Sequence, residues 1–247
     1  MAEWFESEDF WTTYGPIMYD DNLWAEAPDV ADYICKIAGL KKGSKVLDAA
    51  CGIGRISVEL AERGLEVTGV DITSSVLQAA KGMAESQKLK IDFIQQDLRD
   101  FCRKDYFDCA INLYTSFGYC DSKEDDYKIL KNIALSLKKG GIFIMECVSR
   151  ETAIMYFTKG EQFERAGFTV NTEFSVKDAW EGLCSKWILT DKDNHKIEHE
   201  YTQRLYSAPQ LRDKLLECGF ASAQVYGDFD FSPYNENART MILVARK

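Results

Sequence analysis

The chain has 247 residues, of which 46% are hydrophobic and 28% charged, a balance typical of one folded domain with a sizeable core. Its formal net charge of −10 and isoelectric point near 4.9 argue against an extended grip on the phosphates of DNA or RNA. No apolar run approaches the roughly 18 residues of a membrane span, and the start MAEWFESEDF is unlike a signal peptide, so we expect a cytoplasmic protein.

Eight cysteines are spread along the chain without a CxxC pair or the spacing of metal ligands. Several fall in or beside predicted strands, where cysteine behaves as a small apolar residue in a reducing compartment. We therefore predict no metal site and no disulfide framework.

Residues 1–28 are rich in aromatic side chains and include Gly15-Pro16, a turn signal. Such a segment, placed ahead of the first strand, can form a lid over a cleft, or it can simply cover the hydrophobic surface of the domain. From Pro28 to Leu40, apolar residues recur at helical spacing and predict a helix that packs on the sheet.

Residues 46–54 read Val-Leu-Asp-Ala-Ala-Cys-Gly-Ile-Gly and lead into a helical pattern over residues 55–63. A buried strand that ends in glycines and turns into a helix places bare backbone N–H groups beside a crevice. A second short strand over residues 66–71 ends on Asp71, and an acid there can accept hydrogen bonds from both hydroxyls of a ribose. This pattern predicts a site for an adenosine-bearing cofactor.

Two residues bear on which cofactor binds. A dinucleotide-binding loop needs a third glycine where this chain has Ser57, and Asp48 just before the loop would repel a pyrophosphate and suit a cationic ligand. S-adenosylmethionine carries a sulfonium and an ammonium group and has no phosphate. The residues therefore favour S-adenosylmethionine over a dinucleotide.

The stretch from Val46 to Asp71 closely resembles motif I of the class I S-adenosylmethionine-dependent methyltransferases, and the resemblance to small-molecule members extends over nearly the whole chain. It implies that Asp71 binds the ribose, that Asp97 and the Leu98 backbone contact the adenine, and that Tyr14 and Tyr19 close over the methionine end. The full set of cofactor-binding residues expected on this basis is Tyr14, Tyr19, Asp48, Ala50, Gly52, Gly54, Asp71, Ile72, Asp97, Leu98 and Asn112.

Further strands over residues 91–94, 107–113 and 142–146 alternate with helical patterns and predict a parallel sheet. Because ligands lie at the carboxyl ends of such strands, the loop over residues 114–119 should face the transferable methyl group. Tyr114 in this loop and Glu146 at the tip of the fifth strand are candidates to contact the methyl acceptor. Glu146 could equally be structural.

The pattern changes at Arg150. Polar, β-prone segments with a hairpin turn at residues 191–194 predict an antiparallel insert over the cleft, covering about residues 150–206. His199 in this insert is a candidate base, whereas His195, beside the turn, is expected in solvent. Arg204 is a candidate to orient an acceptor, or else a structural charge. The insert is also where a homo-oligomer could form.

Ser207 and Pro209 open a helix that ends near Gly219, and strands follow over residues 220–226 and 240–245. The resemblance implies that the last strand is antiparallel and lies beside the fifth. The predicted fold is one α/β domain over residues 1–247. It combines a seven-stranded, mostly parallel, doubly wound sheet whose last strand is antiparallel with an N-terminal lid and the antiparallel β insert.

The predicted function is in-line transfer of a methyl group from S-adenosylmethionine to a nitrogen, oxygen or sulfur atom, with a small metabolite as the acceptor. A NAD-type oxidoreductase is an alternative that Asp48 and Ser57 disfavour. A protein that binds S-adenosylmethionine without catalysis is a second alternative.

Overall fold

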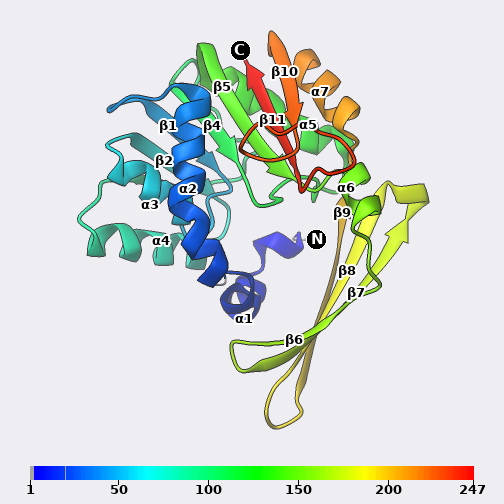
Figure 1. The fold of residues 1–247 in the computed structure, drawn as a ribbon. Coiled ribbons are helices and arrows are strands. Elements are labelled where there is room, and N and C mark those ends of the chain that lie inside the picture. Colours follow the sequence, from blue (N-terminus) through cyan, green and yellow to red (C-terminus); the bar gives the residue numbers. More distant parts are fainter. Residues whose placement is uncertain (1–2, 20) are drawn as a thin grey trace.

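The computed structural model describes residues 3–19 and 21–247 (Figure 1). Seven strands form one sheet in the order β10-β11-β5-β4-β1-β2-β3, and four form a second sheet in the order β6-β7-β8-β9. The strands of the first sheet are β1 (Lys45–Ala49), β2 (Glu66–Asp71), β3 (Asp92–Gln95), β4 (Phe107–Asn112), β5 (Leu137–Cys147), β10 (Ser222–Tyr226) and β11 (Met241–Arg246). Those of the second are β6 (Gln162–Arg165), β7 (Phe168–Lys177), β8 (Gly182–Thr190) and β9 (Lys196–Arg204).

The large sheet is parallel except at its C-terminal end. Strands β1 to β5 pair in parallel, whereas β11 is antiparallel to both β5 and β10. Both the strand order and the antiparallel last strand agree with the predicted fold class.

Helices cover both faces of the large sheet, because neighbouring residues of its buried strands point in opposite directions. Val46 and Ile144 pack with α2 and α3 on one face, and Leu47 and Phe143 pack with α5 and α7 on the other. The helices are η1 (Trp4–Glu6), α1 (Glu8–Met18), α2 (Asp21–Ala38), α3 (Arg55–Glu62), α4 (Ser74–Ser86), α5 (Lys123–Ser136), α6 (Arg150–Met155), η2 (Asp178–Trp180) and α7 (Ala208–Glu217). Within the described ranges, no helix is both long enough and apolar enough to cross a bilayer.

Helix α2 begins at Asp21 rather than at Pro28, so the prediction of its start was wrong. Ala27, Ala31 and Ile34 are all buried on one face of the helix, and this packing continues through the proline. The end of the expected lid segment is thus part of a helix that packs on the sheet. The rest of the expected lid segment forms η1 and α1, which do not belong to this helix.

Helix α1 lies against the small sheet. Phe10 and Ile17 form one buried cluster with Val170 of β7 and Leu189 of β8. The small sheet projects from the main body of the fold, with α1 between the two in Figure 1. Strand β6 and helix α6 were not predicted, since both are short and lack a clear hydrophobic period.

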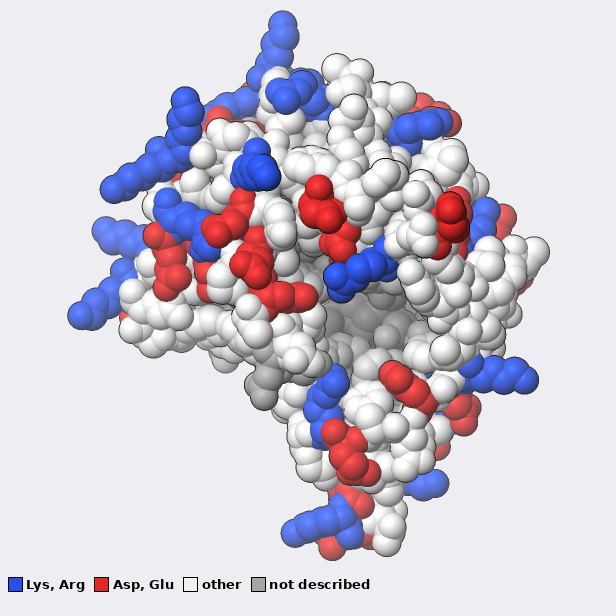
Figure 2. All heavy atoms as spheres, viewed as in Figure 1, with Lys and Arg blue, Asp and Glu red and all other residues white. Residues whose placement is uncertain are grey.

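The face of the molecule shown in Figure 2 carries lysine and arginine side chains interspersed with aspartate and glutamate. No continuous basic band crosses this view. Mixed charge of this kind offers no track for a phosphate backbone on this face.

Candidate active site

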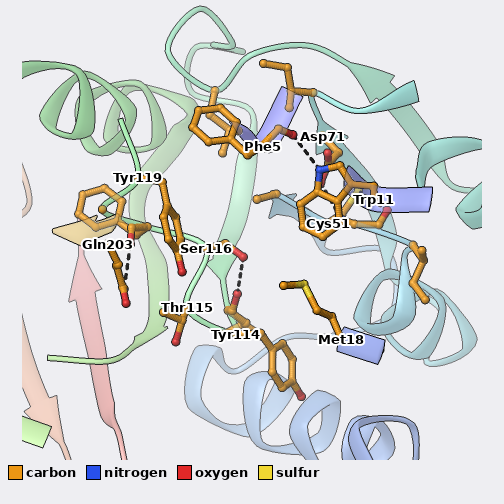
Figure 3. Close-up of a pocket in the computed structure, with 18 of the residues that line it drawn as sticks. Phe5, Trp11, Met18, Cys51, Asp71, Tyr114, Thr115, Ser116, Tyr119 and Gln203 are labelled. Carbon is orange, nitrogen blue, oxygen red and sulfur yellow. Dashed lines mark hydrogen bonds between the residues drawn. The ribbon is translucent and has the colours of Figure 1, made fainter. Parts of the chain in front are cut away.

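A cavity of about 730 Å³ opens at the carboxyl ends of β1, β2, β4 and β5. Three parts of the chain line it: the loops of the large sheet, the N-terminal residues of η1 and α1, and the small sheet. In Figure 3, Tyr119 and Thr115 lie on one side of this space, and Cys51, Trp11 and Met18 lie on the other. This position at the strand ends is where parallel α/β sheets bind their ligands.

The loop between β1 and α3 is held against the tip of β2. Asp71 accepts hydrogen bonds from the backbone N–H of Gly52 at 2.8 Å and of Thr73 at 3.0 Å, and burial raises the pKa of its carboxyl group. The loop also needs left-handed backbone, with φ of 53° at Gly52. Asp71 therefore holds the loop in place, and it also lines the cavity; its contact with a ribose remains a prediction.

Tyr19 closes over the same loop. A Cβ atom added at Gly52 would lie 2.7 Å from the Tyr19 hydroxyl oxygen, closer than real Cβ atoms come. We expect Gly52→Ala to weaken S-adenosylmethionine binding at least about tenfold, because it strains a left-handed position and displaces Tyr19. Isothermal titration calorimetry measures this loss.

The matched control for that substitution is Gly82→Ala on α4, where an added Cβ would meet nothing within 4 Å. It should leave cofactor affinity unchanged and stabilise the helix slightly. Equal affinities of the two alanine variants would show that the close approach at Gly52 is not needed for binding.

Asp48 is buried at the end of β1 and accepts a 2.6 Å hydrogen bond from the Ser57 hydroxyl. Ser57, which stands where a dinucleotide-binding loop would have its third glycine, is thus the partner of this acid. Burial raises the pKa of Asp48 to about 6 from its ordinary value of 3.8.

The raised pKa of Asp48 makes stability depend on pH. The Asp48 carboxyl group stays protonated up to about pH 6 in the folded protein but only up to about pH 3.8 in the unfolded chain. Its contribution to the free energy of unfolding is therefore complete below about pH 3.8 and is lost as the pH rises through about 6. We expect a loss on the order of 3 kcal/mol in the free energy of unfolding relative to Asp48→Asn, which does not titrate. Urea unfolding of both proteins from pH 4 to 7 measures it, and parallel pH profiles would contradict the assignment.

Arg99 joins the predicted adenine end of the cavity to the N-terminus. Its guanidinium donates to the Asp97 carboxylate at 2.7 Å and forms ion pairs with Glu3 at 3.3 Å and Glu6 at 3.5 Å. Burial alone would raise the pKa of Asp97, but the hydrogen bonds from Arg99 hold it below its usual value. Asp97 and Leu98 line the cavity, and their contacts with adenine remain predictions.

The structure brings most of the predicted residues together. Those that line the cavity are Tyr19, Asp48, Ala50, Gly52, Asp71, Ile72, Asp97, Leu98, Tyr114 and Glu146. The remaining predicted residues lie behind the cavity wall or beside it, and each has a physical reason to be there.

Three predicted cofactor residues fall outside the wall. Gly54 donates its N–H to the Cys51 carbonyl, and a Cβ there would press on Ala80 and Phe93, so this glycine serves packing. Asn112 is buried and donates to the Ala49 carbonyl at 2.9 Å, which ties β4 to β1.

The third of these residues, Tyr14, stacks on Phe10 one turn earlier in α1, and its hydroxyl lies 3.4 Å from the Ile197 carbonyl oxygen of the small sheet. It therefore anchors α1 to that sheet. Tyr19, at the end of the helix, is the tyrosine that reaches the cavity.

Two candidate catalytic residues, His199 and Arg204, are also not among the residues that line the cavity. The His199 ring packs 4.4 Å from the Phe10 ring, and burial lowers its pKa. Arg204 is ion-paired with the buried Asp126 and also donates to the Cys120 and Asp121 carbonyls, so it is a structural charge. Tyr114 and Glu146 are the two candidates that reach the cavity.

Several residues that sequence reasoning missed also line the cavity. Trp187 with Ser185 on β8, and Tyr201 with Gln203 on β9, face it from the small sheet. The members of each pair are two residues apart and so share one face of a strand. That alternation was visible in the sequence, but which face turned toward the cleft was not.

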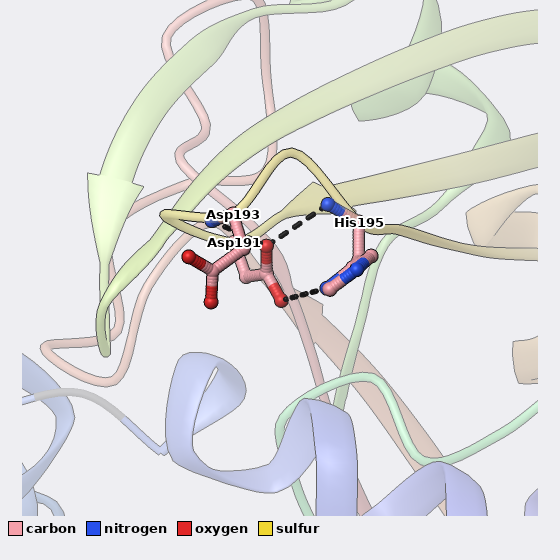
Figure 4. Close-up of side chains that lie close together, drawn as sticks. All are labelled: Asp191, Asp193 and His195. Atoms are coloured by element: carbon pink, nitrogen blue, oxygen red, sulfur yellow. Dashed lines mark hydrogen bonds and ion pairs between the residues drawn. The ribbon is translucent and has the colours of Figure 1, made fainter.

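The hairpin turn at the tip of the small sheet lies apart from this site. Asp191 accepts hydrogen bonds from the backbone of Asp193 and His195, and its carboxylate lies 3.1 Å from the His195 ring nitrogen (Figure 4). His195 is exposed, as predicted. These three side chains come close enough to hold an ion, but their contacts are those that close the turn.

A family model described as a methyltransferase domain matches residues 40–204. The chain belongs to this methyltransferase family. YqeM of Bacillus subtilis strain 168, which is provisionally named a methyltransferase, is 27% identical over 222 residues, covering 85% of this chain and 87% of that protein. The ubiquinone biosynthesis O-methyltransferase of Coxiella burnetii (strain RSA 493) is 34% identical over 123 residues, covering 49% of this chain and 51% of that protein.

Solved methyltransferases share the fold. A S-adenosylmethionine-dependent methyltransferase from Clostridium acetobutylicum has a TM-score of 0.77 at 18% identity, covering 96% of this chain and 97% of that chain. CalS10, an amino pentose methyltransferase from Micromonospora echinaspora solved with S-adenosylmethionine, has a TM-score of 0.70 at 17% identity and covers both chains fully. Together with the family match, these findings confirm the predicted family, fold class and enzyme class, and with them S-adenosylmethionine as the methyl donor.

Proposed function

We propose that this methyltransferase acts on a small metabolite, and that η1 and α1 form a lid over its cofactor. The observation that carries the proposal is the cavity at the strand ends, whose volume of about 730 Å³ is in the range of small-ligand pockets. Residues of the N-terminus and of the small sheet line it together with the loops of the large sheet, as in a pocket for a small ligand. The mixed surface charge and the net charge of −10 also disfavour nucleic acid.

The residues at the strand tips fit the predicted cofactor. The Gly52 backbone lies so close to Tyr19 that a side chain at position 52 would collide with the tyrosine hydroxyl. Asp48 and Asp71 each bring a carboxylate to the cavity. In this proposal Asp71 holds the ribose hydroxyls, Asp48 favours the cationic methionine end, and Tyr19 covers that end. S-adenosylmethionine supplies a methyl group on a sulfonium, a leaving group that needs no acid. The chain therefore mainly positions the reactants and excludes water.

The titles of related proteins support a small acceptor. CalS10 is an amino pentose methyltransferase, and KedS8 of Streptoalloteichus, at 18% identity and a TM-score of 0.70, is a sugar N-methyltransferase. The lid is supported by the ion pairs of Arg99 to Glu3 and Glu6, which fasten η1 beside the predicted adenine site. We also propose that the enzyme is cytoplasmic, because its eight cysteines are spread as in proteins of a reducing compartment.

Calorimetry with S-adenosylmethionine, S-adenosylhomocysteine and NAD tests the cofactor. We expect the first two to bind and NAD not to bind. Incubation with fractionated cell metabolites should then release S-adenosylhomocysteine from fractions of low molecular mass. Release only with RNA, DNA or protein fractions would overturn the proposal of a small acceptor.

A further inference from the structure

Aromatic rings wall the part of the cavity that lies beyond the cofactor residues. Trp4 of η1 stacks on Tyr201 of β9 at 4.5 Å between ring centroids, and Tyr119 of the β4–α5 loop lies edge-on to both, at 5.2 and 5.9 Å. Trp187 of β8 lines the same cavity. The faces of such rings carry partial negative charge and attract cations.

Two carboxylates line the cavity near the loop that carries Tyr119: that of Asp126, which is paired with Arg204, and that of Glu146. Glu146 at the end of β5 accepts hydrogen bonds from the Thr240 hydroxyl at 2.5 Å and from the Thr115 backbone N–H at 3.2 Å. A carboxylate can accept about four hydrogen bonds, so Glu146 can accept further hydrogen bonds from a ligand. Glu146, at the end of β5, and Tyr119, in the β4–α5 loop, both line this cavity.

The cations that line the cavity, among the described residues, are three arginines with partners of their own. Arg99 pairs with Asp97 and the acids of η1. Arg55 lies over the Tyr114 ring at 4.0 Å and donates to its hydroxyl at 3.1 Å. Arg165 donates to the Ile17 carbonyl at 3.0 Å and stacks over Phe163. The charge offered to an acceptor is therefore that of Glu146 and the ring faces.

We propose that the methyl acceptor is an amine, bound as an ammonium group between the aromatic wall and Glu146. This inference rests on the proposed function and names its substrate class. The ammonium group gives one proton to the Glu146 carboxylate, which leaves a neutral amine and a carboxylic acid. The freed nitrogen lone pair then forms the bond to the methyl carbon as the carbon–sulfur bond breaks with its electrons left on sulfur. The product is a methylated ammonium ion, so charge is conserved.

An oxygen acceptor suits this site less well. A hydroxyl must approach the alkoxide or phenolate form to attack, and a nearby carboxylate with negative ring faces raises the pKa of such a group. A carboxylic acid or phosphate ester would meet the same repulsion without a free cation to offset it. The site thus discriminates by charge as well as by size.

Matched probes test the proposal on the complex of the enzyme with S-adenosylhomocysteine. Three sets are titrated by calorimetry: benzylamine with benzyl alcohol and benzoate, cyclohexylamine with cyclohexanol and cyclohexanecarboxylate, and glucosamine with glucose and gluconate. In at least one set we expect the amine to bind at least about tenfold more tightly than its alcohol and its acid. Preference for an alcohol or an acid, or no binding in any set, overturns the proposal.

The variant Glu146→Gln keeps the shape of the side chain and an oxygen for the Thr115 N–H. It should weaken amine binding at least about tenfold, remove the preference for the amine and leave S-adenosylhomocysteine binding within about twofold. Glu62→Gln, an exposed residue on α3, makes the same charge change as a control and should alter neither. Unchanged amine binding in Glu146→Gln overturns the role of Glu146. Failure of the wild-type enzyme to bind S-adenosylhomocysteine would instead contradict the proposed function.

Discussion

Replacing Asp71 with alanine should weaken S-adenosylmethionine binding at least about tenfold, and by more if both ribose hydroxyls bind it, because charge-assisted hydrogen bonds are lost. The same carboxylate holds the Gly52 and Thr73 N–H groups, so the variant also releases the loop that approaches the ligand. Calorimetry gives the dissociation constant, and circular dichroism shows that the variant is folded.

Two further variants separate the charge of Asp71 from its role in the loop. Asp71→Asn keeps an oxygen for one backbone N–H and should give an intermediate loss. Asp29→Ala, on the exposed surface of α2, removes a carboxylate that touches neither loop nor cavity and should bind normally. A folded Asp71→Ala protein with the wild-type dissociation constant would rule out the predicted ribose contact.

Replacing Asp126 with alanine should lower the free energy of unfolding by about 3–5 kcal/mol, the cost of breaking a buried ion pair. Asp126 has no exposed surface, and its carboxylate accepts from Arg204, from the Tyr206 hydroxyl at 2.8 Å and from the Cys120 N–H at 3.3 Å. Removing it leaves Arg204 largely buried without its counter-charge, at the point where β9 returns to the main sheet. Urea unfolding monitored by tryptophan fluorescence measures the loss.

Glu124→Ala on the same helix is the control for Asp126, since Glu124 is exposed, and it should cost less than about 1 kcal/mol. The double variant Asp126→Ala with Arg204→Met should recover part of the lost stability, because the unpaired charge is gone. If Asp126→Ala proves no less stable than Glu124→Ala, the three-way contact does not stabilise the fold.

The sequence was most informative where a residue type has a local reason to be where it is. Strands with buried runs, the glycine loop after Val46 and the acid at Asp71 all follow from backbone geometry and from the carboxyl-end rule for parallel sheets. The capping serine at residue 207, whose hydroxyl accepts from the Gln210 N–H, follows from helix-end chemistry in the same way.

The sequence was least informative where long-range packing decides. Tyr14 and Tyr19 are equivalent candidates in the sequence. Only the packing of α1 on the small sheet buries Tyr14 away from the cavity and leaves Tyr19 in the cavity wall. Arg204 was a candidate to orient an acceptor or else a structural charge, and the sequence could not decide because its partner, Asp126, lies far away in the chain. The phase of α1 and the pairing of buried charges are properties of the assembled fold.

The two ends of the cavity come from different parts of the chain. The residues proposed to hold the cofactor lie within 48–72 and at 97–99, whereas much of the aromatic wall comes from the N-terminus and from β8 and β9. In this proposal, mutations in β8 and β9 can change the acceptor that is recognised while the residues proposed to hold the cofactor stay intact. Because the two functions are assigned to separate segments, duplicated copies of one ancestral enzyme can come to accept new metabolites through changes in β8 and β9 alone.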